Sequence, residues 1–186
     1  SSFINDSKVQ LAKNNKNSIE GFIELNGFSK NEKVVLEIPE LKIKSNFTTD
    51  ENGLVKFNIP LKKVEYWSPE NPKLYQVIIS SEIDKVSDKI GFRTIKTVNK
   101  DIFLNGKSIF LKGISVHDEN PFAEGRLRSE GDMRMILNWA KELGCNYIRL
   151  AHYTHNETML RLADEVGLLV WAEVPVYWTI SWTTKE

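Results

Sequence analysis

The chain has 186 residues, 41% of them hydrophobic and 10% aromatic, enough for a packed core in one large domain or in two smaller units. Its 25 basic and 25 acidic side chains cancel, which argues against a surface that binds nucleic acid or an anionic membrane. An uncharged partner such as a carbohydrate fits this balance better. No apolar run approaches the length of a membrane span. The opening residues 1–4 are no signal peptide, so any such segment lies upstream of Ser1 and the compartment stays open.

Residues 1–99 have the alternating apolar and polar pattern of β-strands, separated by turn signals at short intervals. This spacing favours a two-sheet sandwich of the immunoglobulin-like kind. The single cysteine, Cys145, leaves no Cys-Trp-Cys framework of the antibody type, and we expect it to be buried. The predicted strands are centred on residues 19–26, 34–38, 55–59, 75–79 and 90–95.

Two aromatic residues, Trp67 and Tyr75, flank a segment that contains Pro69 and Pro72. An aromatic face can stack on a sugar ring, so a carbohydrate-binding platform is one interpretation. Prolines beside an aromatic residue before a strand more often form a rigid, packed corner. We favour the packed corner.

The domain boundary is predicted near residues 98–101, which divides the chain into domains 1–99 and 100–186. Apolar triplets on both sides of Asn105-Gly106 then predict a two-residue hairpin. We expect its outgoing strand to continue through residues 110–116 and to end at His117 and Asp118.

Two amphipathic helices and two further strands follow. Ser129 is suited to cap the first helix and Gly144 to end it, and Asn156 and Gly167 are suited to do the same for the second. Ile148 and Leu150 supply the strand at 146–150. In the strand at 168–174, the run 168–171 has no polar alternation, which is typical of a buried parallel sheet. The expected buried stripe of the first helix contains Met133, Ile136, Leu137, Ala140 and Leu143.

Several polar side chains come at the carboxyl ends of these strands, where parallel α/β folds place their chemistry. His117 and Asp118 follow the first strand, and Glu173 ends the third. His155 lies deeper in its loop, and we interpret it as structural. The second strand and its loop contribute Arg149, His152 and Tyr153, and Trp178 and Trp182 follow the third strand.

The run Asn-Tyr-Ile-Arg-Leu-Ala-His-Tyr at 146–153, followed by Ala-Asp-Glu-Val-Gly-Leu-Leu-Val-Trp at 163–171, resembles the signature of glycoside hydrolase family two. This is the β-galactosidase and β-glucuronidase family. Leu150 and Thr154 stand where the family usually has a small polar residue and a proline. The resemblance implies an immunoglobulin-like β-sandwich followed by the first three strands and two helices of a (β/α)8 TIM barrel. A whole barrel needs roughly 250 residues.

The resemblance also implies a retaining exo-β-glycosidase, most similar to a β-galactosidase, with a β-glucuronidase or β-mannosidase as the alternative within the family. In the family the acid/base glutamate follows the fourth strand and the nucleophile follows the seventh. Both are therefore expected downstream of Glu186, no catalytic residue is expected in this chain, and the chain alone is expected to be inactive. A non-catalytic carbohydrate-binding or scaffold module is the alternative from another class. The expected substrate-binding or supporting residues are His117, Asp118, Arg149, His152, Tyr153, Glu173 and Trp178.

Glu173 has three open roles: an active-site hydrogen-bonding group, the partner of a structural ion pair, or a catalytic carboxylate. With His117 and His152 it has the ligand types of a zinc site, but no compact ligand spacing. Some family members bind magnesium through a Glu and a His, and here Tyr177 and Thr179 replace them. We therefore predict no metal and no cofactor. The open sheet edge at 168–174 predicts a possible self-association.

Overall fold

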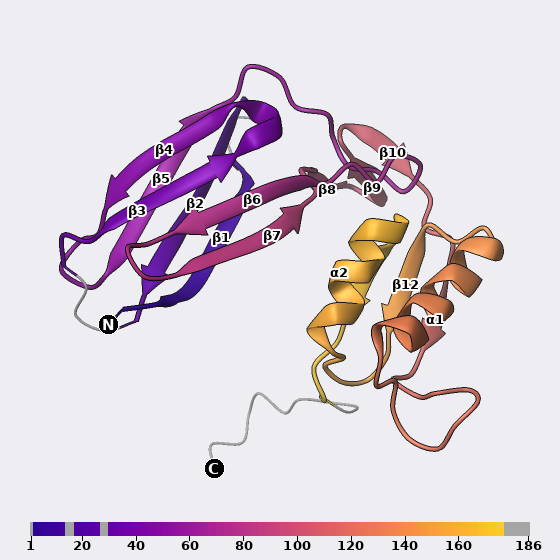
Figure 1. Cartoon of the computed structure of the whole chain (residues 1–186). Helices are drawn as coiled ribbons and strands as arrows, with labels where there is room; N and C mark the ends of the chain where they lie inside the picture. The colour runs from indigo at the N-terminus through magenta and orange to yellow at the C-terminus, as the bar shows by residue number, and fades with distance from the viewer. Residues whose placement is uncertain (1, 14–16, 27–29, 177–186) are drawn as a thin grey trace, which may run out of the picture. The chain divides into compact units, whose positions relative to one another are not determined.

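The computed structural model describes residues 2–13, 17–26 and 30–176. The chain forms two compact units (Figure 1). The first contains residues 1–67 and 73–107, and the second contains residues 68–72 and 108–186.

In the described residues the first unit is a sandwich of two antiparallel sheets around one apolar core (Figure 1). The alternation in the sequence is the cause: Val34, Leu36 and Ile38 point inward and are fully buried, while Val35 and Glu37 between them are not. Four of the five predicted strand centres are confirmed. One sheet has the order β1 (Ile4–Leu11), β2 (Ser18–Leu25), β5 (Leu54–Pro60); the other has the order β4 (Ile43–Thr48), β3 (Lys33–Ile38), β6 (Tyr75–Ser80), β7 (Lys85–Ile90), with the short helix η1 (Pro39–Leu41) between β3 and β4.

The fifth prediction, a strand centred on residues 90–95, is wrong. β7 ends at Ile90, and β8 (Ile95–Val98) begins only after a non-strand segment. The reason is that other partners occupy the backbone there. The Trp67 N–H donates to Phe92 O at 2.9 Å, and the Asn105 side chain accepts from the Thr94 N–H at 3.0 Å.

Trp67 and Tyr75 are packed residues and form no exposed platform. The Trp67 side chain is fully buried, and Tyr75 is almost so. The Arg93 guanidinium lies 4.4 Å from the centroid of the Trp67 ring, a cation–π contact. The packed-corner interpretation is confirmed.

The predicted hairpin at Asn105-Gly106 is confirmed between β9 (Asp101–Leu104) and β10 (Lys107–Ile109). Both loop residues have positive φ, 53° and 83°, as a type I′ turn requires. β9 also pairs with β8, and residues 100–107 therefore belong to the first compact unit. A domain boundary at 99–100 in the natural protein stays a prediction.

Replacing Asn105 with alanine is expected to destabilise the first unit by about 2–4 kcal/mol. The Asn105 side chain accepts from the Thr94 N–H and donates to Trp67 O at 2.9 Å, and its backbone φ is positive. Alanine loses both bonds and strains the turn. Asn105→Gly is the control, because it loses the bonds but tolerates the φ. Urea unfolding measures both, and equal losses for the two variants would contradict the strain contribution.

The second unit has a parallel sheet in the order β11 (Gly113–Val116), β12 (Tyr147–Leu150), β13 (Leu169–Ala172). The predicted alternation of strands and helices is confirmed, with α1 (Glu130–Glu142) and α2 (Glu157–Val166) as the crossovers (Figure 1). Ile148 and Leu150 on β12 are buried in one core with apolar residues of both helices. The helices therefore cover one face of the sheet.

The predicted helix ends are also confirmed. Ser129 and Asp132 form a reciprocal capping box at the start of α1. Asn156 caps α2 by accepting from the Thr158 N–H, and Gly167 ends it with φ 82°. The prediction that Leu143 belongs to the buried stripe is wrong. Leu143 is 70% exposed, because it is the C-cap of α1 and lies past the last buried turn.

Two strand predictions are corrected. The strand expected over 110–116 is interrupted. The Asn146 side chain accepts from the Lys112 N–H and donates to Phe110 O, so the backbone at 110–112 is hydrogen-bonded to this side chain. β10 and β11 therefore belong to different sheets. In β13, Trp171 is 58% exposed, since β13 is an edge strand within the described residues and only part of the run 168–174 is buried.

Residues 68–72 contact the ends of both helices of the second unit. The Lys141 ammonium, in the last turn of α1, donates to Pro69 O at 3.1 Å and to Gly167 O at 3.0 Å. A Cβ atom on Gly167 would lie 2.6 Å from Pro69 O. This segment is therefore part of the packing of the second unit.

Candidate active site

A polar cluster lies at the carboxyl ends of the three parallel strands. His117 follows β11, Arg149 lies on β12, His152 follows β12, and Glu173 follows β13. Because β12 is the middle strand, its side chains reach groups that follow both neighbours. The sheet order thus brings together residues that are far apart in the sequence.

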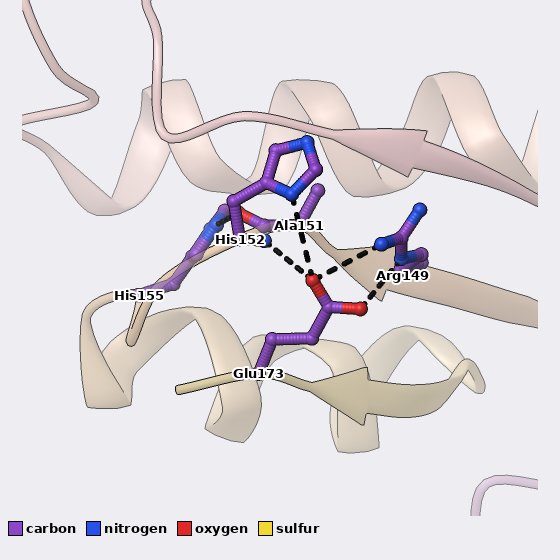
Figure 2. A network of polar contacts seen from close by, with 5 residues as sticks. All are labelled: Arg149, Ala151, His152, His155 and Glu173. Atoms are coloured by element: carbon purple, nitrogen blue, oxygen red, sulfur yellow. Dashed lines mark hydrogen bonds and ion pairs between the residues drawn. The ribbon is translucent and has the colours of Figure 1, made fainter. Parts of the chain in front are cut away.

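Arg149 and Glu173 form a two-point ion pair (Figure 2). Arg149 Nε donates to Glu173 Oε1 at 2.7 Å, and Arg149 Nη2 donates to Oε2 at 3.2 Å. The fork geometry fixes the plane of the carboxylate, which a lysine cannot do. The partner of an ion pair is one of the three roles left open for Glu173 from the sequence, and Glu173 forms such a pair with Arg149.

His152 supplies a further donor to the same carboxylate. Its backbone N–H donates to Glu173 Oε2 at 2.6 Å, and its ring Nδ1 lies 3.9 Å from that oxygen (Figure 2). The residue has φ 73°, a left-handed conformation that is unusual outside glycine and costs energy. This conformation is how the chain turns its N–H toward Glu173 directly after the strand.

The charge state of Glu173 follows from these contacts. The Arg149 side-chain bond and then the His152 N–H hold the pKa of Glu173 below its ordinary value of 4.5. The same bond to Glu173 raises the pKa of Arg149. Glu173 is therefore an ionised acceptor at neutral pH and is poorly suited to donate a proton.

This lowered pKa predicts a pH dependence of stability. A carboxylate whose folded pKa is depressed stabilises the fold above its unfolded pKa, and the contribution is lost as pH falls through the folded pKa. We therefore expect the acid-induced loss of unfolding free energy below about pH 4.5 to be shallower in Glu173→Gln. Chemical unfolding at a series of pH values measures it. Glu70→Gln, at an exposed carboxylate, is the control for the loss of one charge, and parallel slopes for wild type and Glu173→Gln would contradict the prediction.

His117, Asp118 and Tyr153 extend the cluster toward β11. The His117 ring centroid lies 5.1 Å from that of His152 and 6.2 Å from that of Tyr153. The Tyr153 hydroxyl accepts from the Asp118 N–H at 3.1 Å. His117 is exposed, and His152 is partly exposed, so both imidazoles are accessible.

The structure brings together His117, Asp118, Arg149, His152, Tyr153 and Glu173 at one edge of the sheet. Trp178 and Trp182, like Tyr177 and Thr179 of the metal prediction, lie outside the described residues. Within the described ranges no group of His, Cys, Asp and Glu side chains converges as a metal site. The absence of metal and of cofactor stays a prediction.

Sequence reasoning missed Arg126. The Arg126 guanidinium lies 3.6 Å from the buried Asp118 carboxylate and 5.1 Å from the Tyr153 ring centroid. The loop that carries Arg126 had no motif, so only coordinates reveal its contact. His155, interpreted as structural from the sequence, is buried and stacks on Tyr153, with ring centroids 5.1 Å apart.

Two family models match nearly the whole chain. Residues 4–93 match the model described as "Glycosyl hydrolases family 2". Residues 95–185 match "Glycosyl hydrolases family 2, TIM barrel domain". The chain belongs to glycosyl hydrolase family 2. The predicted resemblance is thereby confirmed, and so is a match across both units.

Curated relatives within glycosyl hydrolase family 2 have more than one activity in their names. A β-galactosidase of Arthrobacter sp. is 33% identical over 74% of this chain and 13% of its own length. A β-glucuronidase of Streptococcus agalactiae is 37% identical over 62% of this chain and 20% of its own length. This chain therefore spans a fifth or less of these two proteins.

Solved structures of similar proteins agree with the fold. A β-galacturonidase of Eisenbergiella tayi bound to galacturonate has a TM-score of 0.75 and 30% identity, over 91% of this chain and 32% of that one. A β-glucuronidase of Bifidobacterium dentium has a TM-score of 0.80 over 94% of this chain and 31% of that one, at 19% identity, which shows the fold alone. In the described residues no helix is long and apolar enough to span a membrane.

Proposed function

We propose that this chain is the immunoglobulin-like sandwich and the opening (β/α)8 portion of a retaining exo-β-glycosidase. Its preferred substrates are proposed to be β-galactosides. The single observation that carries the proposal is the Arg149–Glu173–His152 network at the carboxyl ends of parallel strands, in a chain of family 2. In barrel enzymes that edge of the sheet is where substrates bind.

Each side chain has a role in this proposal. His117 is exposed and His152 is partly exposed, and their ring centroids lie 5.1 Å apart, so both are placed to hydrogen-bond the hydroxyl groups of one sugar ring. Arg149 fixes Glu173, and Glu173 in turn fixes the backbone of His152. Tyr153 and Asp118 hold the end of β11 beside them. Trp178, which lies outside the described residues, is proposed to stack on the sugar ring.

Glu173 itself is proposed as a supporting group and not as a reacting carboxylate. Retaining enzymes use one carboxylic acid as proton donor and one carboxylate as nucleophile, about 5–5.5 Å apart. Glu173 is ionised, and both of its oxygens already accept hydrogen bonds from Arg149, which weakens it in either role. We propose that both reacting glutamates come from strands beyond Glu186.

A panel of nitrophenyl glycosides tests the proposal in the protein at its natural full length. We expect turnover of the β-galactoside with retained anomeric configuration, read by NMR of the first-formed sugar, and none of the α-anomer. The 186-residue chain alone is expected to give no turnover. Hydrolysis by the chain alone would contradict the assignment of the reacting glutamates, and an inverted product would contradict the retaining mechanism.

A β-glucuronide is the second candidate substrate, and a specific observation favours it. One of the similar curated proteins, at 37% identity, is named a β-glucuronidase, and a similar solved structure at 30% identity is a β-galacturonidase. The panel separates the candidates, because a uronide carries a carboxylate that a galactoside lacks. The β-mannoside arm tests the third family activity. Sugar binding without hydrolysis of any arm would instead support a non-catalytic module, and light scattering would test self-association through β13.

A further inference from the structure

The proposed reaction makes no use of His155, although it is the most buried of the three histidines in the chain. It is 7% exposed, and its Nδ1 has no hydrogen-bond partner in the part of the chain that the structure describes. A buried ring nitrogen without a partner is uncommon, because desolvation is unfavourable for a polar atom. Contacts at other atoms of the His155 ring must therefore hold this side chain in place.

One contact closes the loop that follows β12. His155 Nε2 lies 3.3 Å from Ala151 O (Figure 2). A carbonyl oxygen only accepts, so the ring carries a hydrogen on Nε2. Ala151 is also buried, and its N–H donates to Val116 O at 3.0 Å. Ala151, the residue before His152, is thus held at its N–H by the end of β11 and at its carbonyl by His155.

The second contact reaches the other imidazole. The His155 ring stacks on Tyr153 with an interplanar angle of 20°. The Tyr153 hydroxyl accepts from the N–H of Asp118, the residue directly after His117. His155 is therefore linked to His152 through the loop backbone, and to His117 through Tyr153 and its hydrogen bond to the Asp118 N–H.

We propose that His155, with a hydrogen on Nε2, is a positioning residue that closes the 151–155 loop and so holds His152 in its left-handed conformation, with its N–H on Glu173 and its ring against His117. This inference rests on the proposed glycosidase function for its kinetic consequence. Its geometric content stands without that function.

Two substitutions separate the hydrogen bond from the stacked ring. His155→Gln places an amide N–H the same number of bonds from Cα as imidazole Nε2, but it removes the aromatic ring. His155→Phe keeps a ring against Tyr153 and removes the donor. The buried Ala151 carbonyl then loses its hydrogen bond from residue 155. Both variants are made in the full-length protein, and their thermal midpoints are compared with that of wild type.

In the full-length enzyme we expect His155→Phe to lower kcat by about 10-fold to 30-fold with KM within about 3-fold, and His155→Gln to keep kcat within about 3-fold. Loss of thermal stability in His155→Phe with unchanged kcat of the folded enzyme would show a purely structural role and overturn the proposal. Equal kcat losses in the two variants would overturn the assignment of positioning to the hydrogen bond.

Crystal structures of wild type and His155→Phe decide the geometry independently of activity. We expect residue 152 to leave the left-handed region in His155→Phe and the His117–His152 centroid distance to lengthen beyond 5.1 Å. An unchanged loop in the variant would overturn the inference. If wild type hydrolyses no glycoside of the panel, the proposed function fails, and this structural comparison still supports or overturns the role of His155.

Discussion

Replacing Arg149 with methionine is expected to lower kcat/KM by at least about 100-fold in the full-length enzyme. Methionine has a similar length but no donor, so Glu173 loses two hydrogen bonds, at 2.7 and 3.2 Å, and is free to rotate. The carboxylate then no longer fixes the His152 N–H. Steady-state kinetics on the best substrate of the panel measures the effect.

Matched variants identify the cause of that loss. Arg149→Lys keeps the charge but lacks the fork, and we expect it to recover less than a tenth of the lost activity. Glu173→Gln and the double variant with Arg149→Met complete a mutant cycle, and because the two residues act as a unit, the double variant should lose little more than either single one. Fully additive losses would contradict a shared role, and wild-type kcat/KM in Arg149→Met would contradict the proposed site.

Replacing Trp67 with alanine is expected to destabilise the first unit by about 3–5 kcal/mol. The indole is fully buried, it lies beneath Arg93, and a Cβ atom on Gly91 would lie only 2.7 Å from its Cδ1. Its removal leaves a cavity that the surrounding packed residues fill only in part. Since small domains are stable by about 5–15 kcal/mol, this is a large share of the total.

Guanidinium unfolding measures the effect of Trp67→Ala. Trp139→Ala, at a partly exposed indole on α1, is the control and should cost much less. Trp67→Phe should recover part of the loss by refilling the cavity. Weakened sugar binding in Trp67→Ala without lost stability would revive the carbohydrate-platform interpretation.

Local signals predicted most elements of the fold correctly. Ser129, Asn156 and Gly167 mark helix ends by short-range chemistry, and the structure confirms all three. The errors in the strands predicted over 90–95 and 110–116 come from long-range partners. No local pattern shows that Asn146 binds the backbone at 110–112, or that Trp67 and Asn105 occupy the backbone near residues 92–94.

The candidate site shows the same division. The sequence predicted Arg149, His152 and Glu173, because each stands at the end of a parallel strand and strand ends meet at one edge. It did not predict that the His152 backbone N–H, at a residue with φ 73°, is the donor to Glu173. A left-handed backbone conformation at a residue other than glycine cannot be recognised from the residue type. Arg126 contacts the cluster at the Asp118 carboxylate and the Tyr153 ring, and His155 stacks on Tyr153; neither contact follows from a local sequence pattern.

The segment 68–72 limits where the chain can be truncated to obtain the second unit alone. A version begun at Lys100, the predicted domain start, would omit Pro69, whose carbonyl accepts from the Lys141 ammonium. The ammonium would keep Gly167 O but lose one of its two acceptors, and the surface around Gly167 would be uncovered. Deletion series that aim to find the smallest stable piece should therefore keep a peptide spanning residues 68–72, supplied in trans if necessary.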